Sequence, residues 1–278
     1  MVGESAHGSP AGPLRELIAR YDGYRQRGVA PARHLGLPSP FMTVIVTLEE
    51  PLQIAEHVDR RRPPARYRSL VGGLHVTPAI IEHDGAQSGI QLRVSPIASR
   101  ALLGMPAGEL AGADLAADEV LGRLAGELHE RLCAATGWPE RFAILDAVLS
   151  RRLGEALPPA PVINAWALLN RRQGSIPIST LASEVGWSER QLANRFEQEI
   201  GLSPKVAARV IRFDRARHAL QSQLSGDGRT DIAWVAAECG YHDQSHLVRD
   251  FRSFTGLAPS RWLAYEFGNV QVEPLVAV

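Results

Sequence analysis

The chain of 278 residues is predicted to be an α+β protein, with a β-rich N-terminal domain and an all-helical C-terminal domain. Three observations lead to this prediction. Apolar, β-branched runs typical of strands lie before about residue 97, and helix-type periodicity dominates after it. A proline-rich stretch at 153–162 interrupts the helical pattern, and a helix must stop there. The third observation is an internal repeat in the last hundred or so residues, described below.

The N-terminal domain is expected at 1–157, with a cupin-like β-barrel unit at about 34–97. Its strands are predicted from runs of apolar and β-branched residues that Gly, Pro or Ser interrupt. These runs lie at 41–48, at 67–81, which Gly72, Gly73 and Pro78 divide, and at 88–95. In the last run Ile90, Leu92 and Val94 alternate onto one face, as expected of a half-buried strand.

Helices are expected on both sides of this β-unit. An amphipathic helix is predicted near 13–26, and further helices are predicted at about 98–153. Within 118–132 one apolar stripe has helical spacing. It consists of Leu121, Leu124, Ala125, Leu128 and Leu132. The stripe either pairs two copies of the chain, which makes a homodimer a candidate assembly, or packs on the chain's own barrel.

The C-terminal part contains two copies of one pattern, at 181–204 and 235–259. The first half of each copy matches with an offset of 54 residues and the second half with an offset of 55, so one inserted residue, His242, separates the two registers. The matched pairs are Ala182 and Ala236, Glu184 and Glu238, Gly186 and Gly240, Trp187 and Tyr241, Leu192 and Leu247, Phe196 and Phe251, Gly201 and Gly256, and Pro204 and Pro259. Two like units in tandem indicate a surface that contacts a repeating object, and DNA is the obvious candidate.

Each copy has the pattern of a helix-turn-helix. The first helix of the first copy ends at Gly186, the residue type favoured after a helix C-terminus. The second helix begins at Ser188 with Gln191 three residues later, which is capping-box spacing. Asp243 has the capping position in the second copy. Between the copies, residues 204–221 are rich in helix formers and predict a rod of roughly 27 Å. Such a rod could hold two helices about one DNA turn apart, ~34 Å. An all-helical domain with a purely architectural repeat is the alternative.

Residues of about 162–265 resemble the DNA-binding domain of the AraC/XylS family of bacterial transcription regulators. The segment GYHDQSHLVRDFRSFTGLAPSRW at 240–262 carries most of this likeness, and the first copy is its weaker counterpart. The resemblance implies two helix-turn-helices joined by a long helix, with each second helix entering the major groove of promoter DNA. We therefore expect a linker at 158–161, a DNA-binding domain at 162–268 and a tail at 269–278.

The resemblance also indicates which side chains would contact DNA. Arg190 suits guanine and Asn194 suits adenine, whereas Ala193 offers only an apolar contact, for example to a thymine methyl. Arg195 is expected to reach a phosphate or a carboxylate such as Glu199. The candidate DNA-binding residues are Arg190, Ala193, Asn194, Arg195, Gln244, Ser245, His246 and Arg249. A solvated helix face is the alternative for each of them.

Charge agrees with a local rather than a global attraction to DNA. The formal net charge is zero, which excludes a strongly basic protein. Residues 188–218 nevertheless hold seven basic and four acidic side chains, so positive charge is expected around the first reading helix and the rod. Phosphate neutralisation requires such a patch rather than a high overall isoelectric point.

The N-terminal part is more loosely similar to the divergent cupin-like sensor domains that precede AraC-type DNA-binding domains. The likeness lies in Pro38 and Ser39 and in SPIASRALLGMPAGEL at 95–110. It implies that the barrel senses a small molecule or a partner, although a barrel of this size can also be filled by side chains. An apolar or aromatic ligand is expected, with His75 and Arg93 holding an anionic group. The candidate ligand-binding residues are Phe41, Val44, His75, Ile90 and Arg93.

We expect no metal, no cofactor and no enzymatic activity. The plausible metal ligands in the β-unit are His57, His75, His83 and Glu82, and the HxH pair of metal-binding cupins is missing from the sequence. No nucleophile elbow, phosphate loop or zinc signature occurs either. Cys133 and Cys239 are expected to be buried thiols.

The sequence therefore predicts a sequence-specific transcription regulator. Its N-terminus lacks the apolar core of a signal peptide and no run of about 18 apolar residues occurs, so a cytoplasmic protein is expected. Double-stranded promoter DNA is the expected partner, and a small-molecule effector and RNA polymerase are further candidates. The alternatives are a cupin-like enzyme or ligand carrier fused to a DNA-binding module, and a DNA-binding protein that needs no ligand.

Overall fold

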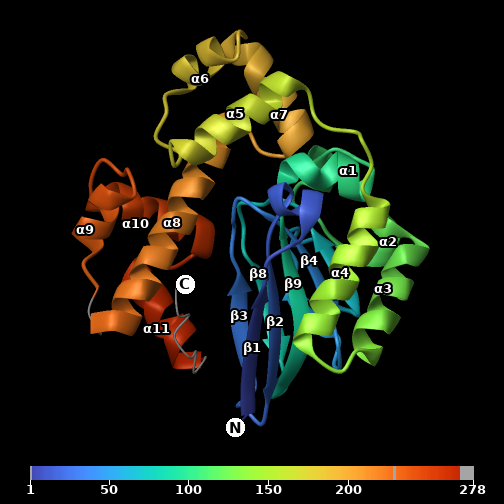
Figure 1. Ribbon diagram of the computed structural model, residues 1–278. Coiled ribbons are helices and arrows are strands. Elements are labelled where there is room, and N and C mark those ends of the chain that lie inside the picture. The colour runs from blue at the N-terminus through green and yellow to red at the C-terminus, as the bar shows by residue number, and fades with distance from the viewer. Residues whose placement is uncertain (1, 228–229, 270–278) are drawn as a thin grey trace.

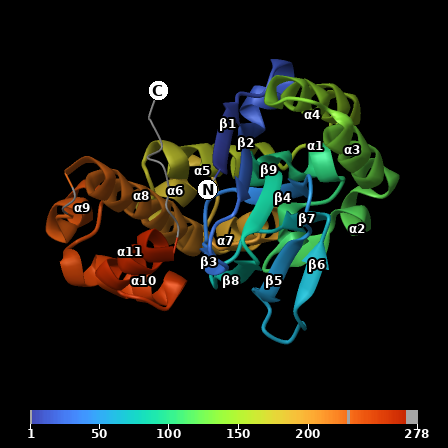
Figure 2. The ribbon, with the colours of Figure 1, turned by 90° about the horizontal axis from the view of Figure 1, so that it is seen from below.

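The N-terminal domain contains two antiparallel sheets that enclose an interior space. The computed structural model describes residues 2–227 and 230–269, so the expected tail beyond residue 269 lies outside the described residues. Six strands pair in the order β1-β2-β9-β4-β7-β10, and four pair in the order β3-β8-β5-β6. Figure 2 shows the two sheets from below, with α11 beside β3. The strands are β1 Val2–Gly8, β2 Ile18–Arg27, β3 Ala32–Gly36, β4 Met42–Thr47, β5 Leu52–Glu56, β6 Ala65–Tyr67, β7 Ser69–Gly72, β8 Ala79–His83, β9 Ala86–Val94 and β10 Asp114–Ala116.

The six-stranded sheet is covered on both faces, which explains the continuous apolar run in β4. Val44 pairs with Leu92 and Val46 with Ile90, and all four side chains are buried in the core that the helices complete. The residues between them in β4 face the interior space between the sheets. A strand that is buried on both faces reads as a continuous apolar run, and no polar residues show which of its side chains point to which face of the sheet. Its run of residues therefore identifies the strand but not the direction of its side chains.

The predicted helix at 13–26 is wrong. A short 3-10 helix, η1 Gly12–Glu16, is followed directly by β2, which pairs with β1 and over most of its length with β9. Leu14, Ile18 and Tyr21 are buried at a spacing that suits a helix as well as an irregular strand entry. Pairing with β9, distant in sequence, decides the outcome. The β-unit consequently begins at β1 rather than at about residue 34.

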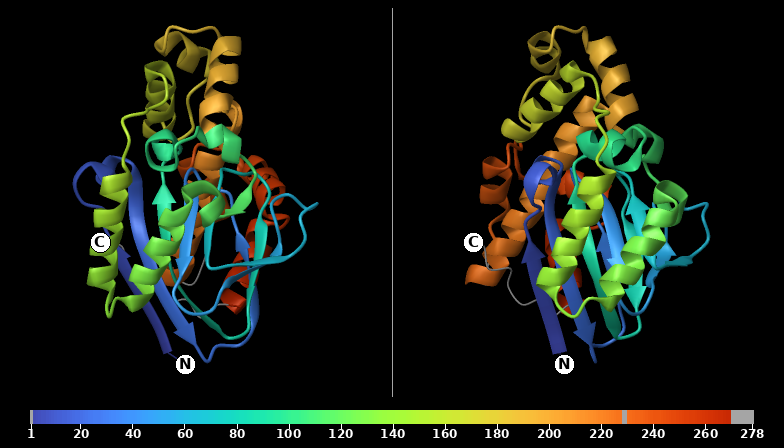
Figure 3. Two further views of the ribbon diagram at one scale, coloured as in Figure 1. Left: turned by 90° about the vertical axis from the view of Figure 1, so that its right-hand side faces the viewer. Right: turned by 45° about the vertical axis from the view of Figure 1, so that its right-hand side comes forward.

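Four helices of the N-terminal domain follow β9 in the chain, the first of them before the short strand β10, and they pack on the outer face of the six-stranded sheet or at its end (Figures 1 and 3). They are α1 Ser99–Leu103, α2 Ala117–Leu121, α3 Arg123–Ala134 and α4 Trp138–Arg152. The short 3-10 helices η2 Pro96–Ala98 and η3 Ala107–Leu110 flank α1. The apolar stripe of α3 packs on the chain's own core: Ala125, Leu128 and Leu132 are buried, and Leu124 is half-buried. The intramolecular alternative is therefore the correct one, and this stripe is not free to pair two copies.

The C-terminal domain is all-helical, as predicted. Its helices are α5 Ala160–Arg171, α6 Ile178–Glu184, α7 Glu189–Ile200, α8 Pro204–Asp227, α9 Ile232–Glu238, α10 Gln244–Thr255 and α11 Pro259–Asn269. Helix α8 has 24 residues, longer than the expected rod, and spans about 36 Å at 1.5 Å per residue. Figure 1 shows α5, α6 and α7 above the barrel, and α9, α10 and α11 beside it, with α8 running between the two groups. Residues 153–159, between α4 and α5, contain no helix or strand.

Two contacts between the domains are prominent among the described residues. Helix α7 packs on η3 so closely that a Cβ at Gly108 would lie 2.2 Å from the carbonyl oxygen of Gln198. At the other place α11 lies beside β3, and the Tyr265 hydroxyl donates to the Arg33 carbonyl oxygen at 2.9 Å. Among residues 2–227 and 230–269, no helix is both long and apolar enough to cross a membrane.

Candidate functional site

The two repeats form two helix-turn-helices whose turns carry the same backbone hydrogen bonds. The amide of Trp187 donates to the Ala182 carbonyl oxygen at 3.0 Å, and the matching amide of Tyr241 donates to that of Ala236 at 2.9 Å. The turns are closed by glycines with left-handed backbones: φ is 73° at Gly186 and 74° at Gly240. The matched sequence positions therefore build matched turns.

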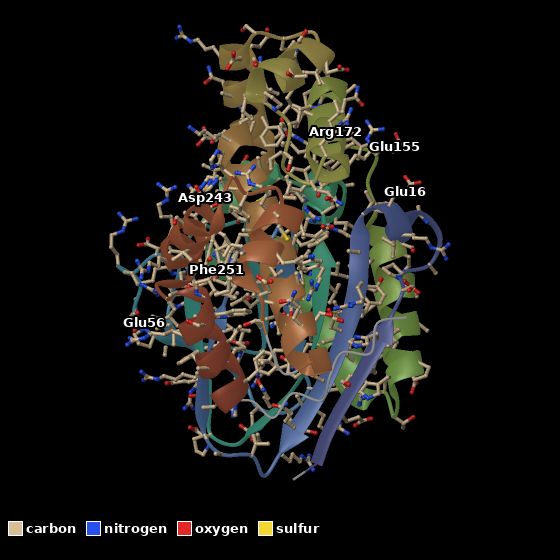
Figure 4. The ribbon with its side chains drawn as sticks, turned by 90° about the vertical axis from the view of Figure 1, so that its left-hand side faces the viewer. Glu16, Glu56, Glu155, Arg172, Asp243 and Phe251 are labelled. Carbon is tan, nitrogen blue, oxygen red and sulfur yellow. The ribbon has the colours of Figure 1, made fainter. Side chains whose placement is uncertain are left out.

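Both second helices begin with a side-chain cap, as predicted. Ser188 Oγ accepts from the amide of Gln191 at 3.2 Å, and Asp243 Oδ1 accepts from the amide of His246 at 2.7 Å. Figure 4 labels Asp243 at the start of α10 and Phe251 about two turns further along. Gly201 and Gly256 end α7 and α10 in the left-handed region, with φ of 91° and 75°. The framework of each reading helix is thus explained by its capping residues and its buried face.

The structure leaves most of the candidate DNA contacts on open surface. Arg190, Asn194 and Arg195 on α7 are exposed, and Ala193 is half-buried between them. On α10, Gln244, Ser245 and Arg249 are exposed. The buried residues Leu192, Phe196, Leu247 and Phe251 lie on the opposite sides of the two helices. The exposed side chains of α7 therefore differ from those of α10, although the buried residues of the two helices match.

Two of the expected contacts are placed differently from the prediction. The expected Arg195–Glu199 pair does not form: Arg195 Nη1 donates to Gln198 Oε1 at 3.4 Å, and Glu199 is buried in a bond to Arg100. The ring of His246 packs edge-on against Tyr241, with the ring centroids 5.1 Å apart. His246 is therefore a half-buried residue that contributes less open surface than its exposed neighbours Gln244 and Ser245.

The arginines of α8 hold the domain together instead of forming a free basic surface. Arg209 donates from Nε and Nη2 to Asp250 of α10, at 3.1 and 2.9 Å, and Asp250 is 4% exposed. Arg212 donates to the Gly174 carbonyl oxygen, and Arg215 to that of Glu238. The exposed positive charge lies elsewhere in the domain. It is carried by Arg171, Arg172, Arg190, Arg195, Lys205, Arg249, Arg252 and Arg261.

The second functional feature is a cavity of about 340 Å³ between the two sheets. The six-stranded sheet supplies a largely polar wall, and the four-stranded sheet supplies an apolar wall that includes Ile54, Ala79 and Ile81. Two residues of the C-terminal domain, Arg217 of α8 and Glu266 of α11, also line it. The polar wall consists of Tyr24, Thr43, Gln87, Gln91, Arg93 and Asp114. A volume of this size lies at the lower end of the range for small-molecule sites.

The cavity corrects part of the expected ligand-binding set. His75 and Arg93 line it, as expected, but Phe41, Val44 and Ile90 do not. Val44 and Ile90 are buried on the opposite face of the sheet, against the helices. A strand's side chains alternate, so an error of one residue in parity moves a whole set to the other face. The residues that replace them in the cavity wall include Thr43 and Gln91, and Gln91 Nε2 donates to Thr43 Oγ1 at 3.5 Å across the two strands.

Burial in and around the cavity shifts several pKa values. The pKa of His34 falls to about 4 because burial disfavours its charged form and His83 adds repulsion. Burial likewise lowers the pKa of His75, whose Nδ1 lies 2.7 Å from the Thr77 carbonyl oxygen. Burial raises the pKa of Tyr24 to about 12 and that of Glu266 above its usual range. His34 and His75 are therefore neutral at pH 7.

A buried polar cluster supports one end of the cavity. His57, 1% exposed, lies with Nδ1 3.2 Å from Asp114 Oδ2, and the Tyr67 hydroxyl lies 3.5 Å from His57 Nε2. The expected metal candidates do not converge: over the described ranges, no three His, Cys, Asp or Glu side chains are close enough to share an ion. His83 instead accepts from the amide of Gly85. Cys239 is buried as expected, but Cys133 is exposed, which corrects its assignment as a buried thiol.

Two helix-turn-helices on one connecting helix define a DNA-binding domain, and the comparisons with known proteins agree. Residues 181–265 match a family described as "Helix-turn-helix domain". The chain is 28% identical over 154 residues to the HTH-type transcriptional activator RhaR of Escherichia coli, an alignment that covers 52% of this chain and 53% of that protein. The chain thus matches about half the length of these curated relatives.

One solved structure shows the same kind of fold over most of the chain. An apo variant of ToxT from Vibrio cholerae is similar with a TM-score of 0.50 and 12% identity, over 88% of this chain and 96% of that one. A transcriptional regulator from Chromobacterium violaceum with an AraC-type DNA-binding domain is 24% identical, with a TM-score of 0.34, over 41% of this chain and 95% of that one. The C-terminal part of this chain is an AraC-type helix-turn-helix domain.

Proposed function

We propose that this protein is a transcription regulator that binds promoter DNA sequence-specifically through α7 and α10 and responds to a small molecule in the barrel. The observation that supports the proposal most is the pair of helix-turn-helices, in which the buried and capping positions match but the exposed residues of α7 and α10 differ. Arg190 of α7 corresponds to Ser245 of α10, and Asn194 corresponds to Arg249. Each reading helix would therefore recognise its own base sequence in one of two adjacent major grooves.

The base-reading roles follow from side-chain chemistry and exposure. Arg190 and Arg249 would donate to guanine, Asn194 would pair with adenine, and Ala193 would contact a thymine methyl. Gln244 and Ser245 would donate and accept at the start of α10, whereas the half-buried His246 would contribute less. Arg195 would bind phosphate, together with the other exposed cations of the domain, such as Arg172 and Lys205.

Regulation by a ligand is supported by the position of the cavity. Its wall includes Arg217 and Glu266 of the DNA-binding domain, so an occupant would contact both domains. A ligand shifts a conformational equilibrium only by the difference in its affinity for the two states. A site formed by both domains provides such a difference whenever the domains move relative to each other. The open cavity also favours this hypothesis over a DNA-binding protein that needs no ligand.

The proposal places the protein among regulators rather than enzymes, and next to the chromosome in the cytoplasm of a bacterium. RNA polymerase is a further candidate partner, as for any protein that acts at a promoter. No dimer is proposed through α3, because its apolar stripe is buried in its own domain.

Genome-wide footprinting in the source organism tests the DNA-binding part. We expect discrete protected sites upstream of genes, and affinity that falls steeply between low and physiological salt because phosphate contacts release counterions. An absence of protected sites, or affinity independent of salt, would contradict the proposal. The ligand part is tested separately, by screening small molecules for a change in affinity for the sites found.

A further inference from the structure

We propose that the cavity selects a short bifunctional ligand, with an anionic group at one end, an ammonium or hydroxyl group at the other, and an apolar skeleton between them. This inference rests on the proposed function, in which the cavity is the effector site. It replaces the apolar or aromatic ligand expected from the sequence. Hydrogen-bond acceptors lie at one end of the polar wall of the cavity, and hydrogen-bond donors lie at the other end.

The acceptor end is formed first by Asp114. Its side chain is more than nine-tenths buried, and Oδ2 lies 3.2 Å from both His57 Nδ1 and the amide of Val58. Oδ1 has no hydrogen-bond partner within the described part of the chain, and Asp114 lines the cavity. Gly72 keeps the approach to Oδ1 open, because a Cβ there would lie only 3.7 Å from that oxygen. A buried acceptor held in place in this way lacks a donor that a ligand can supply.

His75 adds a second acceptor at the same end. Its Nδ1 lies 2.7 Å from the Thr77 carbonyl oxygen, which can only accept, so Nδ1 carries the proton. The lowered pKa of His75, caused by burial, keeps the ring neutral and leaves Nε2 as an acceptor. Asp114 and His75 both line the cavity. An ammonium group has three donors and a hydroxyl has one, so either can satisfy this end, whereas a carboxylate cannot.

The donor end is formed by two guanidinium groups from different domains. Arg93 uses Nε for Asp22 at 3.2 Å, and no described residue accepts from its terminal nitrogens. Arg217 uses Nε and Nη2 for Asp214 of its own helix. Both arginines line the cavity.

The arginines at this end outnumber the aspartates that pair with them. Arg20 also contacts Asp22, at 2.6 Å, so three guanidinium groups share two carboxylates. The nearby Glu266 has a raised pKa because it is buried, which favours its uncharged form. His7, which lies 2.8 Å from Asp22, and His218, whose pKa is lowered by burial, complete the set of titratable groups. The terminal nitrogens of Arg93 are thus left for an anion, and a planar guanidinium favours a carboxylate or a phosphate.

Sheet register fixes the distance between the two ends. Arg93 pairs with Thr43, Thr43 with Gly72, and Gly72 with Asp114, so these residues form one row on one face of the sheet. Three interstrand steps of about 4.8 Å separate the Cα atoms of Arg93 and Asp114 by roughly 14 Å. The opposite wall is apolar and would cover the skeleton of the ligand. A small molecule with the same group at both ends would satisfy only one of them.

Titration calorimetry with the full chain tests this ligand class. The probes are straight-chain ω-amino acids and ω-hydroxy acids of graded length, the matching monocarboxylic acids and the matching amines. We expect at least one bifunctional compound to bind tenfold or more tightly than either matched monofunctional compound. Asp114→Asn should abolish the advantage of the amino acid over the monocarboxylic acid. Arg93→Gln should instead weaken the binding of every acid.

Controls separate a lost site from a lost fold. Asp84→Asn removes an exposed carboxylate of the same β-unit that is not in the cavity wall, and it should leave the preference unchanged. Gly72→Ala adds a methyl group in ordinary contact distance, so the variant should fold and bind bifunctional ligands more weakly. Equal binding of bifunctional and monofunctional probes, or binding of none of them, overturns the ligand class. Footprinting remains positive in that case if the DNA-binding function is correct, so the two failures are distinguishable.

Discussion

Replacing Arg100 should weaken the docking of the first helix-turn-helix on the N-terminal domain. Arg100 of α1 donates from Nε and Nη2 to the two oxygens of Glu199 near the end of α7, at 2.7 and 2.8 Å. The Glu199 side chain is 7% exposed, whereas that of Arg100 is 32% exposed. Breaking a buried pair by removing one partner costs about 3–5 kcal/mol. The partial exposure of Arg100 favours the lower figure, about 3 kcal/mol.

The position of Glu199 in the repeat indicates that it serves the contact between the domains. With the offset of 55 residues it corresponds to Phe254, which is buried in the second unit against Phe213. The first unit has a carboxylate where the second has a core aromatic ring. Undocking the domains would hydrate Glu199, so the cost in Arg100→Ala should appear as domain separation. About 3 kcal/mol corresponds to roughly a hundredfold shift in the docking equilibrium.

Limited proteolysis of the segment 153–159 and its flanks measures this shift. Trypsin should cleave Arg100→Ala after Arg151 or Arg152 markedly faster than the parent protein. The double variant Arg100→Ala/Glu199→Gln should regain part of the protection, because it no longer buries an unpaired charge. Arg131→Ala removes an exposed pair on α3, worth ~0–1 kcal/mol, and is the matched control. If Arg100→Ala and Arg131→Ala were cleaved at the same rate, the docking role of the pair would be refuted.

Three further predictions concern the backbone, pH and the α8 arginines. Gly186→Ala should destabilise the protein by about 1–2 kcal/mol because φ is 73° there, whereas Gly126→Ala, in open space on α3, should stabilise it by about 0.5–1 kcal/mol; thermal unfolding distinguishes the two. The pKa of His34 is lower in the folded than in the unfolded chain, so protonation of the unfolded chain should reduce the free energy of unfolding as pH falls from about 6.5 to about 4. His34→Gln should flatten this part of the profile of stability against pH. An unchanged profile would contradict the burial of a neutral His34. Arg209→Ala should cost about 3 kcal/mol of unfolding free energy by leaving Asp250 buried and unpaired, and a loss confined to DNA affinity would show that Arg209 binds phosphate instead.

The features that sequence could predict are those encoded by neighbouring residues. The caps at Ser188 and Asp243 and the left-handed glycines Gly186 and Gly240 depend on a few adjacent positions, and each was placed correctly. The strand at 41–48 was found for the same reason, because its apolar run is local. Exposure of Arg190 and Arg249 followed from helix periodicity once the helix starts were known.

The features that sequence could not predict depend on partners far along the chain. The segment at 13–26 has helical spacing but becomes β2 because β9 pairs with it. Val44 and Ile90 were assigned to the wrong face of the sheet, because their apolar face packs against helices later in the chain while the more polar face lines the cavity. Arg209 of α8 and Arg100 of α1 look like free cations in the sequence, and their carboxylate partners, Asp250 and Glu199, lie 41 and 99 residues away. No pattern of neighbouring residues records those pairings.

Selection of binding sites from a randomised pool of double-stranded DNA tests the central claim most directly. The parent protein should enrich a non-palindromic site with two differing halves about one helical turn apart. Arg190→Ala should lose base preference in one half and Arg249→Ala in the other, each by about 1–3 kcal/mol at the affected position. If no site were enriched, or if both variants weakened all sequences equally, the two helices would not be reading bases and the account would be wrong.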